Sequence, residues 1–177
     1  MEVREMGSPV KLNIGCGGRK LPGYIGVDAV AERTAADIVA TAENIPLPDE
    51  CAEEIIALHL WEHFYKWQCD DVIKEWRRLL KPGGMLVLEL PNLIKCCQNV
   101  IDGKFVAGKH PDQLGMWGLY GDPRDNDSFM AHRWAWSPQY LTEFLKAKGF
   151  IKIRETKTQW HPAGREHRDM RIEARKA

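Results

Sequence analysis

The chain has 177 residues, enough for one domain with a hydrophobic core. It carries 25 basic and 25 acidic residues, and this zero net charge argues against a large nucleic-acid-binding surface, which normally has a basic excess. No apolar run reaches the roughly 18–20 residues of a membrane span, and the five cysteines contain no CxxC pair, so we expect a reduced, cytoplasmic protein without a disulfide framework.

The first half of the chain predicts short strands joined by turns. Apolar residues favour strands at 10–14 and 24–28, and further strands are expected at 36–40 and 54–58. Only residues 19–23 separate the glycine-rich turn from the second strand. A crossover helix between parallel strands normally needs about ten residues or more. The first helix is therefore predicted to be missing or reduced to one turn.

The second half alternates helices with strands. Between Asp70 and Leu80 the apolar residues recur on one helix face, and Asp70 is the expected N-cap. The remaining elements are a strand, a helix and two final strands, at 85–90, 137–149, 150–154 and 169–174. This alternation predicts an α/β fold with a doubly wound, mostly parallel sheet, and the final pair of strands predicts an antiparallel edge.

The segment 91–136 fits neither pattern. It contains His110, Trp134 and Trp136 and many turn-forming residues. Connections this long in compact domains usually carry function. We therefore expect a single domain over residues 1–177, with 91–136 as a substrate-facing insertion.

The turn after the first strand, Gly15-Cys16-Gly17-Gly18, favours a ligand that lies close to the backbone, because glycine has no Cβ to collide with it. The second strand ends in Asp28, where a carboxylate can accept hydrogen bonds from ribose hydroxyls. A nicotinamide cofactor would need a helix N-terminus for its pyrophosphate, and the short link leaves no room for one. These residues favour an adenosine cofactor without phosphates.

The turn is the first of five motifs that together resemble the class I S-adenosylmethionine (SAM)-dependent methyltransferases. In chain order they are LNIGCG at 12–17, GVD at 26–28, TAENIPLPD at 41–49, HLWEH at 59–63 and LLKPGG at 79–84. The resemblance implies a Rossmann-like fold with a seven-stranded sheet, SAM as cofactor, and direct in-line methyl transfer. The reduced first helix is similar to a compact, type 11-like subgroup often found with glycan and envelope biosynthesis, which implies a small-molecule or glycan-type acceptor.

The resemblance also implies roles for single residues. The expected cofactor contacts are Asn13, Gly15, Cys16, Gly17, Asp28, Thr41, Ala42, Glu43 and His59. Many relatives have acids at the positions of Asn13 and Thr41, so these departures favour weaker cofactor binding. The candidate catalytic residues are His63, His132 and Glu62, and the candidate substrate contacts are Asn92, Trp117 and Arg133. Packing or capping is the competing interpretation for each residue in these two groups.

Two other functions stay open. The spacing His59-x-x-Glu62-His63 matches a zinc-hydrolase motif in which both histidines share a helix face and bind the metal. Here the motif follows a predicted buried strand and has no evident third ligand, so the zinc hydrolase is a remote alternative and no metal is expected. A non-catalytic module that binds SAM or a protein partner would show the same glycine and ribose motifs. Oxygen, nitrogen and carbon acceptors are all compatible with the sequence.

Overall fold

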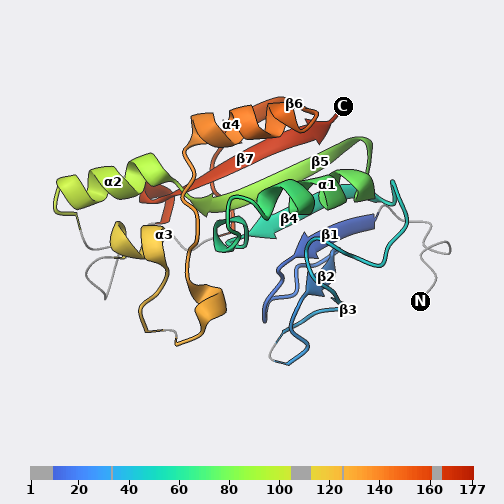
Figure 1. The fold of residues 1–177 in the computed structure, drawn as a ribbon, viewed down its shortest axis with the longest axis horizontal. Helices are drawn as coiled ribbons and strands as arrows, with labels where there is room; N and C mark the ends of the chain where they lie inside the picture. The colour runs from blue at the N-terminus through green and yellow to red at the C-terminus, as the bar shows by residue number, and fades with distance from the viewer. Residues whose placement is uncertain (1–9, 33, 105–112, 125, 161–164) are drawn as a thin grey trace.

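The computed structural model describes residues 10–32, 34–104, 113–124, 126–160 and 165–177 (Figure 1). Its strands are β1 (Val10–Ile14), β2 (Ile25–Asp28), β3 (Ile38–Val39), β4 (Ala52–Leu58), β5 (Leu80–Pro91), β6 (Phe150–Thr156) and β7 (Asp169–Lys176). They form one seven-stranded sheet in the order β3-β2-β1-β4-β5-β7-β6. Because β1 pairs in parallel with both β2 and β4, the chain winds outward in both directions from β1. The predicted α/β fold with a doubly wound sheet is confirmed.

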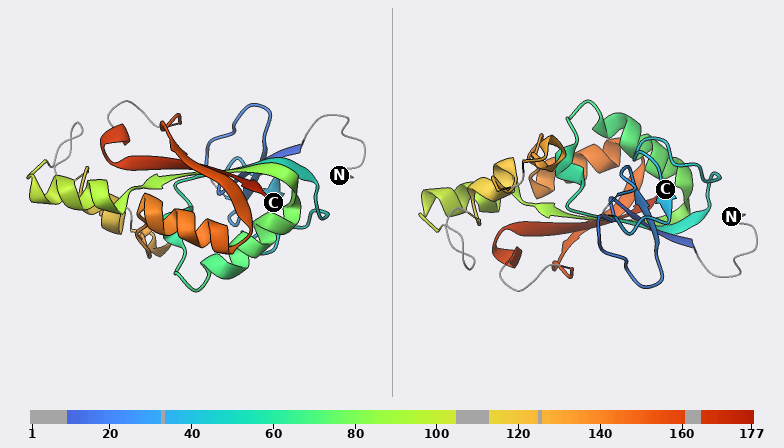
Figure 2. Two further views of the ribbon diagram at one scale, coloured as in Figure 1. Left: turned by 90° about the horizontal axis from the view of Figure 1, so that it is seen from above. Right: turned by 90° about the horizontal axis from the view of Figure 1, so that it is seen from below.

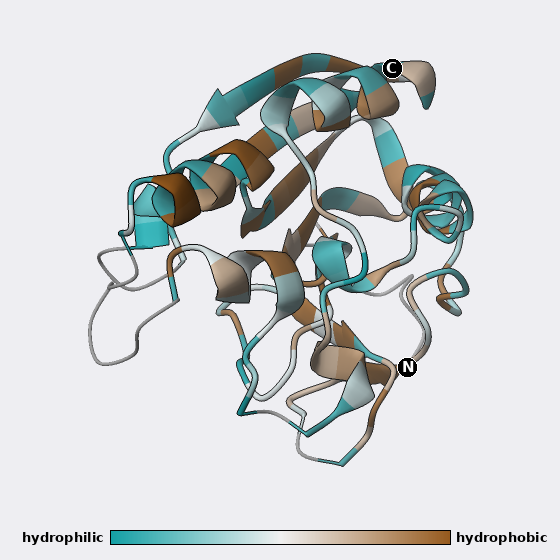
Figure 3. Cartoon of the chain, turned by 60° about the vertical axis from the view of Figure 1, so that its left-hand side comes forward, coloured by the Kyte–Doolittle hydropathy of each residue, from teal (hydrophilic) through white to brown (hydrophobic). Residues whose placement is uncertain are grey.

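The antiparallel edge is also confirmed, since β7 pairs antiparallel with both β5 and β6. One boundary differs from the prediction: β5 begins at Leu80, and residues 81–84 form no separate turn before it. Leu80 already pairs with Ala52, and a register shift follows before Glu54 pairs with Met85. In Figure 3 the strands at the centre carry mostly hydrophobic residues, as expected for strands covered on both faces.

Two helices, α1 (Cys69–Leu79) and α4 (Pro138–Ala147), lie on the same face of the sheet (Figure 2). Both contribute buried apolar residues to the larger core cluster, among them Trp76 and Phe144. The Ser137 side chain caps α4 by accepting a hydrogen bond from the N–H of Tyr140. The predicted cap of α1 is wrong, because the helix begins one residue before Asp70, and Asp70 instead forms an ion pair with Lys148 at 2.9 Å.

The opposite face of the sheet is covered by loops where many α/β proteins have helices. The described residues contain no helix between β1 and β2, so the predicted loss of the first helix is confirmed. Leu21 and Trp160, from two separate loops, belong to the apolar cluster around Ile56 and Val87 on this face. The side chains of Leu21 and Trp160 thus cover apolar residues of the sheet that a helix after β1 would otherwise cover.

The insertion contains α2 (Leu93–Ile101), α3 (Met116–Tyr120) and the short 3-10 helix η3 (Ser128–Met130). It returns to the sheet at η2 (Trp61–His63), where the N–H of Arg133 donates to the carbonyl of Glu62 at 2.8 Å. A further 3-10 helix, η4 (Arg165–His167), precedes β7. His110 lies outside the described residues. No helix within the described ranges has both the length and the apolarity to cross a membrane.

Helix α1 also holds the loop 41–49 in place. The indole N–H of Trp76 donates to the carbonyl of Ala42 at 2.9 Å. The carboxylate of Glu75 accepts hydrogen bonds from the N–H of Ile45 and from the guanidinium of Arg78. These bonds matter for function because the same loop forms one wall of the cavity described below.

The substitution Trp76→Ala should lower the free energy of unfolding by about 3–5 kcal/mol, the range for truncating a large buried aromatic side chain. Trp76 is fully buried, and its ring centroid lies 5.4 Å from that of Trp61. The matched control is Trp67→Ala, because the Trp67 side chain is 70% exposed; we expect a change of less than about 1 kcal/mol there. Urea denaturation measures both, and equal losses would contradict the core position of Trp76.

Acid should weaken the fold partly through Glu75. Burial raises the pKa of this carboxyl, but the hydrogen bonds from Arg78 and Ile45 outweigh burial and hold the pKa below its usual value. The ionised form therefore adds stability above the unfolded-state pKa of about 4.3, and this stability is lost as the pH falls. Urea denaturation from about pH 6 to about pH 3 should show a shallower decline for Glu75→Gln than for the wild type. The exposed control Glu53→Gln should keep the wild-type slope.

Candidate functional site

A cavity of about 600 Å³ opens at the carboxyl ends of the parallel strands. Its walls come from the end of β1, the loop after β2, the loop 40–43, the segment 59–64 and the tip of the insertion at 127–130. Ligands of open α/β sheets bind at this edge, near the point where the strand order reverses. Two hollows of about 750 and 830 Å³ elsewhere on the surface are lined mainly by charged side chains and lack this relation to the strand ends.

The glycine turn meets the cavity at Gly15. Gly15 and Gly17 both have positive φ, at 69° and 51°, a conformation that favours glycine. A Cβ on Gly15 would lie 2.7 Å from the side chain of Leu60, whereas a Cβ on Gly17 would meet nothing within 4 Å. The turn is fixed to β2, because the N–H of Gly15 donates to the carbonyl of Val27 at 2.8 Å.

Asp28 connects the turn to the end of β2. One carboxylate oxygen accepts from the N–H of Gly17 at 2.9 Å, and the other accepts from the N–H of Val30 at 3.1 Å. Each oxygen has two lone pairs, so both can accept a further hydrogen bond from a ligand. Because Asp28 borders the cavity and is only half-buried, it can present these lone pairs to ribose hydroxyls.

Three predicted cofactor contacts, Asn13 in β1 and Cys16 and Gly17 in the turn, do not border the cavity. Asn13 is buried, and its Oδ1 has no hydrogen-bond partner among the described residues. Burial, together with the nearby Asp28 carboxylate, raises the pKa of the Cys16 thiol, which makes it a poor nucleophile. Thr41, Ala42 and Glu43 line the opposite wall.

These features fit SAM. The positive-φ turn lets a ligand approach the backbone, and no helix follows it to hold a phosphate. The orphaned Asn13 Oδ1 can accept a hydrogen bond from a water molecule that also binds an ammonium group such as that of the methionine portion.

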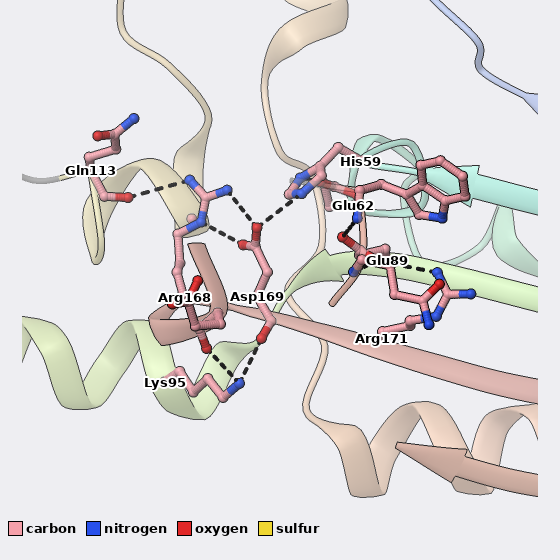
Figure 4. A network of polar contacts seen from close by, with 12 residues as sticks. His59, Glu62, Glu89, Lys95, Gln113, Arg168, Asp169 and Arg171 are labelled. Carbon is pink, nitrogen blue, oxygen red and sulfur yellow. Dashed lines mark hydrogen bonds and ion pairs between the residues drawn. The ribbon is translucent and has the colours of Figure 1, made fainter. Parts of the chain in front are cut away.

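His59 occupies the end of β4 with a positive φ of 52°. Its Nδ1 lies 2.8 Å from Glu62 Oε1, and its Nε2 lies 3.1 Å from Asp169 Oδ2 (Figure 4). Burial alone lowers the pKa of His59, but the two carboxylates outweigh burial and raise it to about 9. Burial likewise raises the pKa of Glu62, but His59 brings it down to about 2. His59 is therefore an imidazolium between two carboxylates.

The zinc-hydrolase alternative is not supported by this geometry. The motif requires two histidines on one helix face, but only the short η2 follows His59. Both ring nitrogens of His59 face carboxylate oxygens, so neither is available to share a metal with His63.

The three candidate catalytic residues come together at the cavity. His63 borders it, and the ring of His132 lies edge-on to the ring of His63 with centroids 4.9 Å apart. Glu62 is buried beside them, with its Oε1 3.9 Å from Nε2 of His132. Burial lowers the pKa of His132, which keeps this imidazole neutral near pH 7.

The three candidate substrate contacts do not border the cavity. Asn92 caps α2 by accepting from the N–H groups of Ile94 and Lys95. Trp117 is buried in α3, and the guanidinium carbon of Arg124 lies 4.8 Å from the centre of its ring. Arg133 lies over the ring of Tyr65 and donates to the carbonyl of Ser128.

Sequence reasoning missed the tip of the insertion and the start of β7. Phe129 and Met130 border the cavity although both are well exposed, and two apolar residues in a polar stretch were a usable signal for a binding surface. No comparable signal existed for Asp169, which meets His59 across 110 positions of the chain.

The substitution Asp169→Asn should cost about 3 kcal/mol of stability, as expected when a buried ion pair loses one charge. Asp169 is fully buried and accepts hydrogen bonds from His59 and from the guanidinium of Arg168. The control Asp70→Asn removes an exposed ion pair with Lys148 and should cost less than about 1 kcal/mol. Chemical denaturation measures both variants, and a small loss for Asp169→Asn would contradict its structural role.

Comparisons with known proteins agree with this site. Residues 12–88 match the family model described as a methyltransferase domain. No curated protein matches the chain by sequence. Among solved structures, a SAM-dependent methyltransferase from Archaeoglobus fulgidus superposes with a TM-score of 0.61 at 17% identity, covering 96% of this chain and 87% of that one.

Two further structures have the same fold. A SAM-dependent methyltransferase from Methanosarcina mazei gives a TM-score of 0.60 at 20% identity, with 96% of this chain and 92% of that one covered. A possible histamine N-methyltransferase from Thermotoga maritima gives a TM-score of 0.62 at 17% identity, with 98% of this chain and 85% of that one covered. Residues 12–88 of this chain thus match a methyltransferase domain, and the chain has the fold of the SAM-dependent methyltransferases on which it superposes.

Proposed function

We propose that this methyltransferase transfers the methyl group of SAM by direct in-line displacement to a small-molecule or glycan-type acceptor. The observation that carries the proposal is one cavity whose lining includes Gly15 and Asp28, from the first two strand ends, together with His63 from η2. A donor held by Gly15 and Asp28 and an acceptor held near His63 would share this cavity. Such alignment converts a bimolecular reaction into an effectively unimolecular one.

The cofactor end of the cavity would use mainly backbone atoms and one carboxylate. SAM, when bound, supplies an electrophilic methyl group on its sulfonium sulfur. Gly15 and Gly17 would admit its methionine and ribose portions, and Asp28 would accept hydrogen bonds from the ribose hydroxyls. The residues 41–43 would hold the adenine against a wall that Trp76 keeps in place.

The acceptor end would lie between η2 and the insertion. Asp127, Phe129 and Met130 border the cavity there, which supports a substrate-facing role for part of 91–136 within a single domain. Glu62, His63 and His132 would contact or position the acceptor, and Arg133 adjoins them. Trp117 and Asn92 have structural contacts, so a substrate role for them depends on movement of the insertion. All five cysteines are free thiols, which supports the predicted reducing, cytoplasmic location.

The substitution Asp28→Ala should weaken binding of S-adenosylhomocysteine at least tenfold, because the ribose loses its carboxylate acceptor. Isothermal titration calorimetry with purified protein measures this affinity. The matched control is Glu32→Ala, which removes a carboxylate from the rim of the same cavity and should leave the affinity within about twofold. An unchanged affinity in Asp28→Ala would refute the ribose role, and a wild type that does not bind S-adenosylhomocysteine would refute the cofactor site.

A turnover assay separates the enzyme from a non-catalytic SAM-binding module. Conversion of radiolabelled SAM is followed with a panel of hydroxylated small molecules and glycans. Methyl transfer to one of them supports the proposal, whereas tight binding without any transfer favours the non-catalytic module.

A further inference from the structure

Three potential metal ligands converge at the acceptor end of the cavity. Glu62 and His63 come from η2, and His132 comes from the returning arm of the insertion. One ligand atom from each, a carboxylate oxygen and two imidazole nitrogens, lies within 4.8 Å of the other two. This set differs from the HxxEH motif, because His132 takes part and His59 does not.

The two imidazoles are already oriented as metal-binding histidines are. Nδ1 of His132 donates to the carbonyl of Gly118 at 3.0 Å, and Nδ1 of His63 donates to the carbonyl of Ala131 at 3.3 Å. In each ring this bond places the proton on Nδ1 and leaves the lone pair on Nε2. A backbone carbonyl that fixes the second ring nitrogen is the usual outer partner of a metal-binding histidine.

The carboxylate of Glu62 is also set up as a ligand. Its Oε1 accepts from His59 at 2.8 Å and lies 3.9 Å from Nε2 of His132, and its Oε2 is buried without a hydrogen-bond partner among the described residues. The residue as a whole is only 2% exposed. A buried carboxylate with one oxygen unpartnered is costly, and a cation bound by this carboxylate would offset that cost.

The backbone holds the two arms of the cluster together. The N–H groups of Arg133 and Trp134 both donate to the carbonyl of Glu62, at 2.8 and 3.3 Å. The N–H of His132 donates to the carbonyl of Tyr120 at 3.2 Å. The three side chains therefore project from a fixed junction.

We propose that Glu62, His63 and His132 bind one divalent transition-metal ion. Two imidazoles and one carboxylate leave a coordination position open, as in catalytic zinc sites, and the same set suits manganese, iron and cobalt. Tetrahedral ligands about 2.0–2.1 Å from zinc lie about 3.4 Å apart. The cluster would have to contract by about 1.5 Å at its widest separation, which side-chain rotations can supply.

The ion would lie where His63 borders the cavity, so its open position could hold an acceptor oxygen. This consequence rests on the proposed methyl transfer, whereas metal binding itself does not. Nε2 of His63 and of His132 would then serve as ligand atoms and not as proton acceptors.

The test uses full-length protein stripped with EDTA, dialysed and titrated with Zn²⁺ by calorimetry, with elemental analysis of the loaded protein. We expect one ion per chain. Loading with Co²⁺ should give visible d–d bands without the near-ultraviolet band of thiolate ligation, which separates this site from the five cysteines. Less than one ion per chain, or a thiolate band, would overturn the proposal without any variant being needed.

The variants His63→Asn and His132→Asn identify the ligands. Asparagine keeps an N–H donor near the position of Nδ1, for the Ala131 or Gly118 carbonyl, but has nothing at Nε2. Each variant should weaken Zn²⁺ binding at least tenfold. The control His167→Asn changes an exposed histidine on η4 and should leave the affinity for Zn²⁺ within twofold of the wild-type value. Wild-type Zn²⁺ affinity in either cluster variant would overturn the site.

Affinity for S-adenosylhomocysteine is measured on the same variants. Retained affinity shows that they are folded and that the loss of metal is local. Metal binding is therefore measured separately from cofactor binding, which the Asp28→Ala variant tests. Failure of the metal-site proposal can then be told apart from failure of the proposed SAM site.

Discussion

The imidazole of His59, between the carboxylates of Glu62 and Asp169, is the contact on which the geometry of the site depends. It joins the end of β4, the short helix η2 and the start of β7 at one point. Without the positive charge of His59, two buried carboxylates would repel each other and would lack solvation. Arg168 adds a second cation, with its Nε 2.6 Å from Asp169. The positive φ of His59 is tolerated because both ring nitrogens are bonded in this conformation.

A second buried network compensates for helices that this chain lacks on one face of the sheet. The carboxylate of Glu89 accepts from the guanidinium of Arg171 at 3.3 Å and from the N–H groups of Gln159 and Trp160. Arg171 also pairs with Glu173 at 3.1 Å. Buried charges are stable only when paired in this way, and the bonds from Glu89 hold Gln159 and Trp160 over the sheet. The indole of Trp160 then covers apolar residues that a helix would otherwise cover.

Features that depend on neighbours in the sequence could be predicted, and features that depend on distant contacts could not. The glycine turn, the absent first helix and the Ser137 cap are all set by local backbone chemistry. Asn92 was expected to contact substrate, although an asparagine directly before an apolar helical run is itself a signal for the N-cap found here. The approach of His132 to Glu62 depends on how the insertion returns to η2, and no spacing in the sequence encodes it. The early start of β5 depends on the pairing of Leu80 with Ala52 in β4. The sequence did not predict this pairing, because Pro82-Gly83-Gly84 is typical of a turn and not of a strand.

One contact links the two ends of the cavity. Leu60 comes immediately before η2, and its side chain occupies the space that a Cβ on Gly15 would fill, at 2.7 Å. Any larger residue at position 15 would displace the Leu60 side chain, which adjoins η2 and its residues Glu62 and His63. Gly15 therefore does more than leave space at the backbone, because it also lets the Leu60 side chain pack against the glycine turn. The in-line transfer proposed above would be sensitive to shifts of about 1 Å between donor and acceptor, so the packing of Leu60 on Gly15 would contribute to alignment together with the positive φ of the glycine.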